Sequence, residues 1–384
     1  MRTGTATDVV IVGGGIVGTA TAAFLAEAGA RVVLVEREGL ASGASGANSG
    51  VVQHPFDPVL AGLYRETVSL YRDLAAVSNA FPFAEHPAGM LYISASEAAV
   101  RRQRALIDDP FPELGTEVVG GEALRRLEPA AGADLWACRV DIGYPVMPGA
   151  STYAYATLAE SRGAVIRSGK AASLEVHGDS VIGVRVSGAL VPAGAVVVAA
   201  GPWTPALLDP SGRWAPIAPR WGVVVEAELA APPRHVLEEA GIEAVLDAGG
   251  DVGDDAGGEA LDEVEFSLVP LPGAAAVGST FLPREPDPAA WMERILMRAS
   301  RFVPGVAEAP IRGVRACARP QSADGRPLIG AVPGRRNLFV CAGHGPWGIS
   351  TGPGSARLIT DLVLGREPAI PPELNPARFG TPAG

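Results

Sequence analysis

The feature that most constrains the fold is a glycine-rich turn near the start of the chain, within the run DVVIVGGGIVGTATAAFLAEAGARVVLVERE at residues 8–38. A β-branched run precedes the turn, small residues continue from it to Gly29, and a second β-branched run ends at Glu36. These patterns predict a buried strand, a helix closed by glycine and a second buried strand. The segment is therefore predicted to be a βαβ unit.

Three glycines of the turn have the spacing of a dinucleotide-binding site. Gly13, Gly15 and Gly18 occupy the positions of G-x-G-x-x-G, which allow a tight turn, backbone approach to a pyrophosphate and close packing of helix on strand. The amides at the helix N-terminus would then face the phosphates, and Glu36 would accept a hydrogen bond from a ribose 2′-OH. The alternative is a glycine turn with a structural role alone.

Composition and charge exclude several classes of partner. The net charge is −11 with 19% charged residues, so the chain has no basic stripe for nucleic acid or for an anionic membrane surface. Its 3 cysteines are too widely spaced for a disulfide framework or a zinc pattern, and no metal site is expected. Residues 9–26 lack charge, but the GGGIVG in their centre argues against a signal peptide or a membrane span. We expect a cytoplasmic protein.

The order of the segments predicts two interleaved domains. Residues 60–140 combine charged helical patterns with one apolar strand, and further strands surround an acidic, glycine-rich segment at about 238–263. Nucleotide-binding patterns return between and after these regions. We predict a discontinuous nucleotide-binding domain and a second domain built from two insertions, with the boundaries 1–55, 140–212 and 320–384 for the first, and 56–139 and 213–319 for the second.

A second glycine-rich turn, in CAGHGPWGIS at residues 341–350, follows an apolar strand pattern at 338–342. We expect this strand to end in the same sheet as the strand at 9–12. The helix that begins near Ile349 would then point its N-terminus at a second part of the same cofactor. A flavin has such a part, because the negative charge that gathers at its N1 and O2 on reduction is stabilised by a helix N-terminus.

Four stretches together resemble the FAD-dependent D-amino-acid oxidase family, which contains glycine oxidase, sarcosine oxidase and D-amino-acid dehydrogenases. They are VVIVGGGIVG…LVERE, SGASGANSGVV, VVVAAGPWT and ARPQSADGRPLIG…NLFVCAGHGPWGISTGPGSARLITDLV. The resemblance covers about the first 55 residues, 150–205 and about the last 65. It implies an α+β two-domain flavoenzyme, in which a Rossmann-like FAD-binding domain carries an inserted antiparallel-sheet substrate domain.

The resemblance also implies which residues contact FAD, and nearly all of these roles need only backbone or small side chains. On the pyrophosphate and ribose side they are Gly13, Gly15, Ile16, Val17, Gly18, Glu36 and Arg37. At the phosphate and flavin edge, at adenine and at a further strand end they are Ala44, Ser45, Ser49, Gly50 and Val51, then Val176, then Ala200 and Gly201. On the pyrimidine side of the flavin they are Gly343, His344, Gly345, Pro346, Trp347, Gly348, Ile349 and Ser350.

Two side chains are predicted to act on the substrate. Arg319, in the segment CARP, falls where glycine-oxidase-like enzymes have a carboxylate-binding arginine, and a guanidinium forms bidentate pairs with carboxylates. The alternative for Arg319 is an ion pair with a nearby acid, such as Asp324. His54 follows the loop that reaches the flavin and would orient the substrate or accept the amine proton, and a structural role fits its pattern equally well. His344 is predicted at the edge of the ring rather than as a proton carrier.

Cys317 and Lys170 leave two questions open. Cys317 matches the cysteine to which sarcosine oxidases bind FAD covalently, yet a buried apolar cysteine is the default. We therefore expect non-covalent FAD, with Cys317 as the alternative attachment point. Lys170 is the only lysine and lies in an adenosine-side segment, so the oxygen-activating lysine of sarcosine oxidases is missing. This absence slightly favours a dehydrogenase over an oxidase. The electron acceptor is left open between oxygen and another molecule.

The predicted function is oxidation of the C–N bond of a small amine or amino acid, with a carboxylate on the substrate, hydride transfer to flavin N5 and hydrolysis of the imine. Pro346 and Trp347 would narrow the pocket, so free glycine is not the expected substrate. Two alternatives remain: dehydrogenation of a 2-hydroxy acid, and an FAD-binding subunit or degenerate homologue without its own turnover. A nicotinamide-dependent dehydrogenase would leave the C-terminal turn and helix without a ligand. Assembly into a homo-oligomer is left open.

Overall fold

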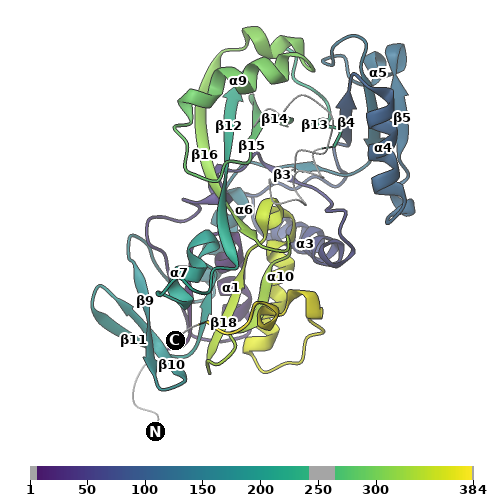
Figure 1. Ribbon diagram of the computed structural model, residues 1–384. Helices are drawn as coiled ribbons and strands as arrows, with labels where there is room; N and C mark the ends of the chain where they lie inside the picture. The colour runs from purple at the N-terminus through teal and green to yellow at the C-terminus, as the bar shows by residue number, and fades with distance from the viewer. Residues whose placement is uncertain (1–6, 242–263, 383–384) are drawn as a thin grey trace.

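Two β-sheets form the frame of the molecule in the computed structural model, which describes residues 7–241 and 264–382 (Figure 1). The sheet in the lower half of Figure 1 carries the first glycine turn, and the sheet in the upper half faces the ends of its strands. Within the acidic segment expected at 238–263, residues 242–263 lie outside the described residues.

The first sheet begins with the strand, glycine turn and helix that the sequence predicts. Strands β1 (Thr7–Val12) and β2 (Val32–Val35) are parallel and are joined by helix α1 (Ile16–Glu27). The spatial order is β17 (Leu328–Ala331), β18 (Leu338–Ala342), β11 (Ala189–Val198), β1, β2 and β8 (Val165–Arg167). Because β18 is parallel to β11 and β11 to β1, the predicted common sheet is confirmed, with β11 lying between the two glycine-turn strands.

Helices cover one face of the first sheet and a β-meander covers the other. Four helices share one hydrophobic core with Ile11 and Leu34 of this face, namely α1, α3 (Pro58–Val77), α6 (Ala150–Ser161) and α10 (Gly348–Val363). Neighbouring elements pack against helix α1 on several sides, and nearly all of its residues are buried. Its small side chains allow this close approach. On the other face, β9 (Ala172–His177), β10 (Ser180–Val186) and Trp214 pack on Val10 and Val33.

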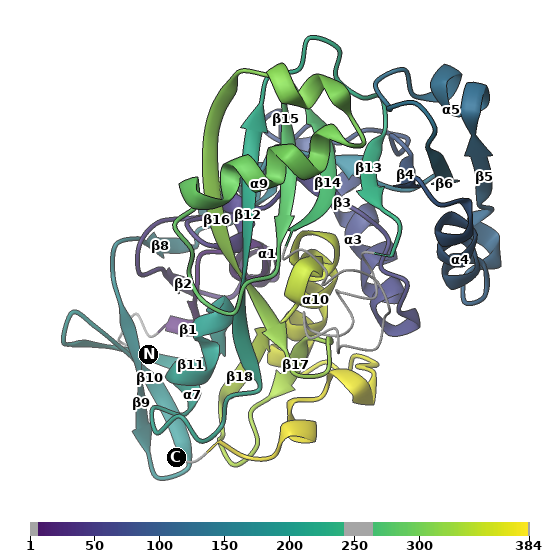
Figure 2. The same ribbon diagram turned by 45° about the horizontal axis from the view of Figure 1, so that its top comes forward.

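The second sheet is mostly antiparallel, as predicted. Its order is β16 (Ile311–Ser322), β12 (Ile217–Ala227), β15 (Ala274–Thr280), β14 (Val264–Leu271), β13 (Val236–Glu239), β4 (Met90–Ser94), β6 (Trp136–Val140) and β5 (Glu117–Gly120). Among the described pairs of this sheet, only β13 and β4 run parallel. Helix α9 (Ala289–Ser300) covers one face near Phe266, whose ring stacks on Phe302 at 4.7 Å (Figure 2).

The two sheets draw on alternating parts of the chain. Strands of the first sheet come from residues 7–35, 165–198 and 328–342, and strands of the second from 90–140 and 217–322. Helix α3 falls in a segment predicted for the second domain, yet its apolar face packs against the helices of the first sheet. The division into two domains with the boundaries given above therefore stays a prediction. Short connecting elements include α2 (Ala44–Ala47), β3 (Val51–Val52), α4 (Glu97–Asp108), α5 (Gly121–Leu127), β7 (Tyr144–Pro145) and α7 (Thr204–Leu208).

Candidate cofactor and substrate site

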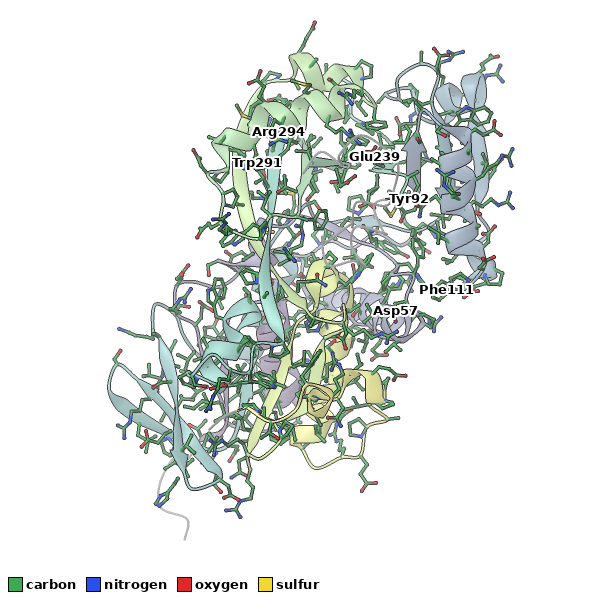
Figure 3. The ribbon with its side chains drawn as sticks, in the orientation of Figure 1. Asp57, Tyr92, Phe111, Glu239, Trp291 and Arg294 are labelled. Atoms are coloured by element: carbon green, nitrogen blue, oxygen red, sulfur yellow. The ribbon has the colours of Figure 1, made fainter. Side chains whose placement is uncertain are left out.

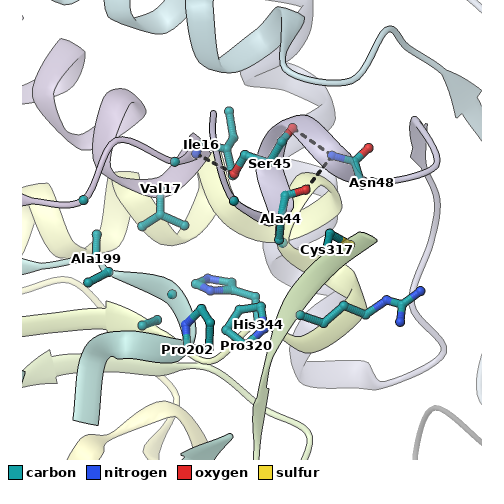
Figure 4. Close-up of a pocket in the computed structure, with 18 of the residues that line it drawn as sticks. Ile16, Val17, Ala44, Ser45, Asn48, Ala199, Pro202, Cys317, Pro320 and His344 are labelled. Carbon is teal, nitrogen blue, oxygen red and sulfur yellow. Dashed lines mark hydrogen bonds between the residues drawn. The ribbon is translucent and has the colours of Figure 1, made fainter. Parts of the chain in front are cut away.

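A cavity of ≈ 410 Å³ lies where the carboxyl ends of β1, β11 and β18 face the second sheet (Figure 4). Gly13, Ala199 and His344, each within two residues of one of these strand ends, line it on one side. Side chains of the second sheet, including Cys317, line it on the other. Ligands of parallel sheets bind at this edge, and the volume is that of a small-molecule or cofactor pocket.

The first glycine turn leaves no room for a side chain at its sharpest point. Gly13 has a φ of +121°, which other residues rarely adopt, and a Cβ there would lie 2.3 Å from the carbonyl oxygen of Ala199. A Cβ on Gly18 would lie 2.0 Å from the carbonyl oxygen of Gly13, so α1 packs directly on the turn. Both glycines therefore have the geometry that the spacing predicts.

The N-terminus of α1 opens into the cavity. Its N-cap residue, Gly15, provides no side-chain cap, and the hydroxyl of Ser45 accepts a hydrogen bond of 3.0 Å from the amide of Ile16 (Figure 4). Gly15, Ile16 and Val17 all line the cavity. The positive end of the helix dipole therefore faces this space, as an anionic pyrophosphate requires.

Glu36 and Arg37 line the end of the cavity where the adenosine is predicted. The carboxylate of Glu36 accepts hydrogen bonds from the amides of Gly14 (2.6 Å) and Glu38 (2.8 Å), which hold it just after β2. The guanidinium of Arg37 lies 4.8 Å from the ring centre of Trp203. Glu36 keeps lone pairs for a ribose hydroxyl, because each carboxylate oxygen accepts more than one hydrogen bond.

Val176 is predicted to touch adenine through its backbone, but it is placed away from the residues that line the cavity. Its side chain is 43% exposed on β9, opposite Val181 in the β9–β10 hairpin, and it does not line the cavity. The chain reaches the cavity earlier, at Lys170, Ala171 and Ala172. The difference is one of register, since four residues along an extended strand correspond to about 13 Å.

The loop that follows β2 is fixed by polar side chains. Asn48 donates hydrogen bonds to the carbonyl oxygens of Ala44 and Ser45 (Figure 4) and accepts one from the amide of Gly50. Arg315, on β16, donates to the carbonyl oxygens of Ala47 and Asn48 at 3.2 and 2.9 Å. The predicted loop residues that line the cavity are Ala44, Ser45, Ser49 and Val51. Arg315 thus ties the second sheet to the loop expected at the flavin edge.

Helix α10 begins in the wall of the cavity and starts one residue from the predicted position. Its N-cap, Trp347, provides no side-chain cap, and Gly348, Ile349 and Ser350 line the cavity. The side chain of His344 is buried with its Nε2 3.0 Å from the Ser355 hydroxyl. Burial lowers the pKa of His344 to about 4, so the imidazole is neutral at pH 7.

The other predicted residues of this region divide into two groups. Those that line the cavity are Ala200, Gly201, Gly345, Pro346, Trp347 and Cys317. Those that lie behind its wall are Gly18, Gly50 and Gly343. Cys317 is 4% exposed and its side chain is a free thiol.

The residues on this side of the cavity fit FAD. Two helix N-termini whose N-cap residues make no side-chain cap open into one cavity, one suited to the pyrophosphate and one to the N1 and O2 edge of a flavin. The turn at Gly13 leaves the backbone open to close approach. Gly13 to Val17, Glu36, Ser45 and Gly348 to Ser350 would hold the cofactor, mainly through backbone groups.

Arg319 lies in the opposite wall of the cavity. Its Nη1 donates to the carbonyl oxygen of Thr280 at 2.8 Å and its Nη2 to the hydroxyl of Ser279 at 2.6 Å. The guanidinium lies 4.5 Å from the ring centre of Phe281. Asp324 pairs instead with Arg378, so Asp324 is not the partner of Arg319. Because a guanidinium has five N–H donors, hydrogens remain for a ligand.

His54 lies outside the cavity, and its predicted contact with the substrate is not supported. The ring is 4% exposed and packs edge-on against Tyr64 and Phe111, with centroids 4.9 and 4.8 Å away. Burial, with a smaller contribution from Arg65, lowers the pKa of His54 to about 4. The preceding residue, Gln53, lines the cavity instead, because successive side chains of an extended chain point in opposite directions.

Four polar residues of the second-sheet side were missed from the sequence: Gln53, Glu238, Ser267 and Ser279. Glu238 lies at the start of the segment interpreted as an acidic excursion, yet it belongs to β13 and is only 7% exposed. The side-chain amide of Gln53 donates a hydrogen bond of 3.3 Å to the carboxylate of Glu238. The available signal was an acid directly after the apolar pair Val236–Leu237, a pattern typical of a strand rather than of a loop.

Comparisons with known proteins identify relatives of the whole chain. The glycine oxidase of Pseudomonas aeruginosa is 29% identical over 95% of this chain and 96% of its own length. The D-amino acid dehydrogenase of Methylobacterium radiotolerans is 30% identical over 94% of this chain and 97% of its own length. The crystal structure of glycine oxidase from Bacillus cereus has a TM-score of 0.80 at 26% identity, over 94% of this chain and 96% of that one.

Two further findings complete the assignment. In the described parts of the chain, no helix has the length and apolar character needed to cross a membrane. A family model described as FAD dependent oxidoreductase matches residues 8–362, which is most of the chain. The chain therefore belongs to the DAO family of FAD dependent oxidoreductases.

Proposed function

We propose that this enzyme oxidises the C–N bond of a small amine or amino acid that carries a carboxylate. The observation that carries the proposal is Arg319, a guanidinium held in the cavity wall by Ser279 and Thr280 with N–H groups left for a carboxylate. The glycine oxidase and D-amino acid dehydrogenase relatives support the substrate class. Bound FAD supplies the hydride acceptor for this chemistry.

The residues of the chain bind and orient the substrate. Arg319 would hold the carboxylate, which fixes the α-carbon relative to the flavin. Phe281 supports the guanidinium from one face, and Trp347 closes part of the cavity with an apolar surface. The amides at the start of α10 would stabilise the negative charge that the cofactor gains.

The decisive experiment is anaerobic mixing of the FAD-loaded enzyme with two matched sets of compounds. Glycine, sarcosine, D-alanine and D-proline represent the amines, and glycolate, lactate and 2-hydroxyglutarate represent the hydroxy acids. We expect an amine to remove the absorbance of oxidised flavin, with sarcosine, D-alanine or D-proline faster than glycine. Reduction by hydroxy acids alone would favour the 2-hydroxy-acid alternative, and reduction by neither set would favour a subunit without its own turnover.

We further propose that FAD is bound without a covalent bond, through the backbone groups around Gly13 and α10. Acid precipitation of the protein should then release all flavin into the supernatant. Flavin that stays with the pellet in the wild type and is released in Cys317→Ser would make Cys317 the attachment point. Reoxidation of the reduced enzyme by air, compared with reoxidation by a quinone or a dye, distinguishes an oxidase from a dehydrogenase.

A further inference from the structure

Strand β16 carries Arg315 on the face of the second sheet that looks toward the first sheet. The preceding residue, Val314, packs on the opposite face, in the core beneath helix α9. Trp291 and Arg294 of that helix lie in the upper part of the molecule, away from the first sheet (Figure 3). Because successive side chains of a strand point to opposite faces, Arg315 lies on the same side of β16 as Cys317, which lines the cavity.

The guanidinium of Arg315 holds two successive carbonyl groups of the loop that follows β2. Its Nε donates to the carbonyl oxygen of Ala47 at 3.2 Å and its Nη2 to that of Asn48 at 2.9 Å. These two N–H groups form one edge of the planar guanidinium, so a single rigid group fixes two peptides at once. The third nitrogen, Nη1, forms an ion pair with Glu226 of β12. Helix α2, which ends at Ala47, therefore stays against β16 (Figure 4).

Holding these carbonyls also fixes the direction of two amides. Both peptides are trans, and a trans peptide is planar with its C=O and N–H pointing in opposite directions. The N–H groups of Asn48 and Ser49 belong to the two held peptides and therefore point away from Arg315. Both residues line the cavity, and neither amide donates to an acceptor among the described residues. The loop thus contains two oriented backbone donors available to a ligand.

The two held peptides lie at the β16 end of the loop. Near the start of the loop, the hydroxyl of Ser45 accepts the hydrogen bond from the amide of Ile16 at the N-terminus of α1, where a pyrophosphate fits. Glu36 lies on the adenosine side of that N-terminus. FAD with its adenosine at Glu36 and its pyrophosphate at α1 has its flavin further along the cavity. We therefore expect the flavin in the part that Asn48 and Ser49 line.

We propose that Arg315 is a positioning residue that presents the amides of Asn48 and Ser49 to the flavin of bound FAD. This inference concerns the cofactor and does not depend on which substrate is oxidised. The loop is held in place before FAD binds, so less ordering opposes binding. The negative charge that a flavin gains on reduction is bound more strongly by N–H donors than a neutral acceptor is. Arg315 thereby strengthens the binding of FAD and favours its reduced form.

The test compares Arg315→Met, which keeps a long side chain but removes its donors, with Arg312→Met. Arg312 is on the same strand and pairs with exposed Glu228 of the neighbouring strand. Titration of the apoprotein with FAD should show a dissociation constant at least about tenfold higher in Arg315→Met, because the loop is no longer held. Arg312→Met should bind FAD as the wild type does.

The midpoint potential of the bound flavin is the second measurement, by reduction against a reference dye. It should fall by about 30 mV in Arg315→Met, which for two electrons is a tenfold greater loss of affinity for the reduced than for the oxidised flavin. A residue that only stabilised the fold would leave this difference between the two forms unchanged. Arg312→Met should keep the wild-type potential.

A double variant separates positioning from charge. Arg315→Met combined with Glu226→Gln has the net charge of the wild type, yet the carbonyls of Ala47 and Asn48 remain unheld. It should show the same losses as Arg315→Met, and a return to the wild-type potential would overturn the inference in favour of a direct effect of charge. Wild-type FAD affinity and potential in an Arg315→Met protein with a cooperative thermal transition would also overturn it. Since neither measurement uses a substrate, failure here leaves the proposed function intact, and a failure of the proposed function leaves these results valid.

Discussion

The two sides of the cavity present different kinds of chemical group. The side toward the first sheet consists of glycine turns and two helix N-termini, which present backbone amides. The side toward the second sheet consists of side chains, with Arg319, Glu238 and Ser279 supplied by three strands that are far apart in the chain. The first side has the groups to hold FAD, whereas in the function proposed above the second side contacts the substrate.

This difference predicts opposite responses to mutation. A backbone site fails when a side chain is added, because the added atoms occupy the space of the cofactor or of the packed turn. A side-chain site fails when a side chain is removed or displaced, while the backbone around it remains in place. Four substitutions test this contrast, in order of decreasing expected effect on function.

Gly13→Ala tests the backbone side and should have the largest effect. The new methyl group would lie 2.3 Å from the carbonyl oxygen of Ala199 at a φ of +121°, so the turn has to shift. We expect loss of bound FAD on gel filtration and, with it, loss of flavin reduction. Gly39→Ala is the control, because nothing lies within 4 Å of a Cβ there. If Gly13→Ala retained full flavin content, the backbone cradle would be misassigned.

Arg319→Ala tests the second-sheet side. It removes the predicted carboxylate anchor, and the loss of a charge-assisted bidentate contact corresponds to a rise in KM of about tenfold to a hundredfold. Flavin content should stay at the wild-type level, in contrast to Gly13→Ala. Arg312→Ala, on the same strand but exposed and paired with Glu228, serves as the matched control. Unchanged kinetics in Arg319→Ala would refute the anchor.

The same contrast explains what the sequence could predict. The turn at Gly13, the start of α10 and the buried strands are local patterns, in which a few adjacent residues determine the geometry. The cavity wall depends on register between distant strands, for example the pairing of Glu238 with Ser267. Val176 and His54 show this dependence, since each lies one or a few residues from a residue that does line the cavity.

Gly222→Ala is a substitution whose effect the sequence alone would not suggest. A Cβ at Gly222 would lie 2.3 to 2.5 Å from the guanidinium atoms of Arg319, so the guanidinium would have to leave Ser279. A misplaced anchor should raise KM by up to about tenfold with little change in flavin content. Gly313→Ala, on the neighbouring strand with open space around its Cβ, is the control. Equal KM values for Gly222→Ala and the wild type would mean that the observed position of Arg319 is not needed for binding.

His54→Phe should leave kcat and KM nearly unchanged and alter only the pH dependence of stability. His54 has a pKa of about 4 when folded, below its ordinary value of 6.5, because burial disfavours the charged ring. Between these values the unfolded chain binds a proton that the folded chain does not, so the free energy of unfolding falls as the pH is lowered through this window. The loss from this histidine between pH 7 and pH 5 is about 1–2 kcal/mol.

Urea unfolding of the wild type and of His54→Phe at both pH values isolates this contribution. His344, whose pKa is also lowered to about 4, and Glu265, whose pKa burial raises to about 7, titrate in both proteins and cancel in the difference. The variant should therefore lose less stability on acidification than the wild type, whatever the cost of fitting the larger ring beside Tyr64 and Phe111. A large fall in kcat with unchanged pH dependence would return His54 to the reaction and break the contrast between the two sides of the cavity.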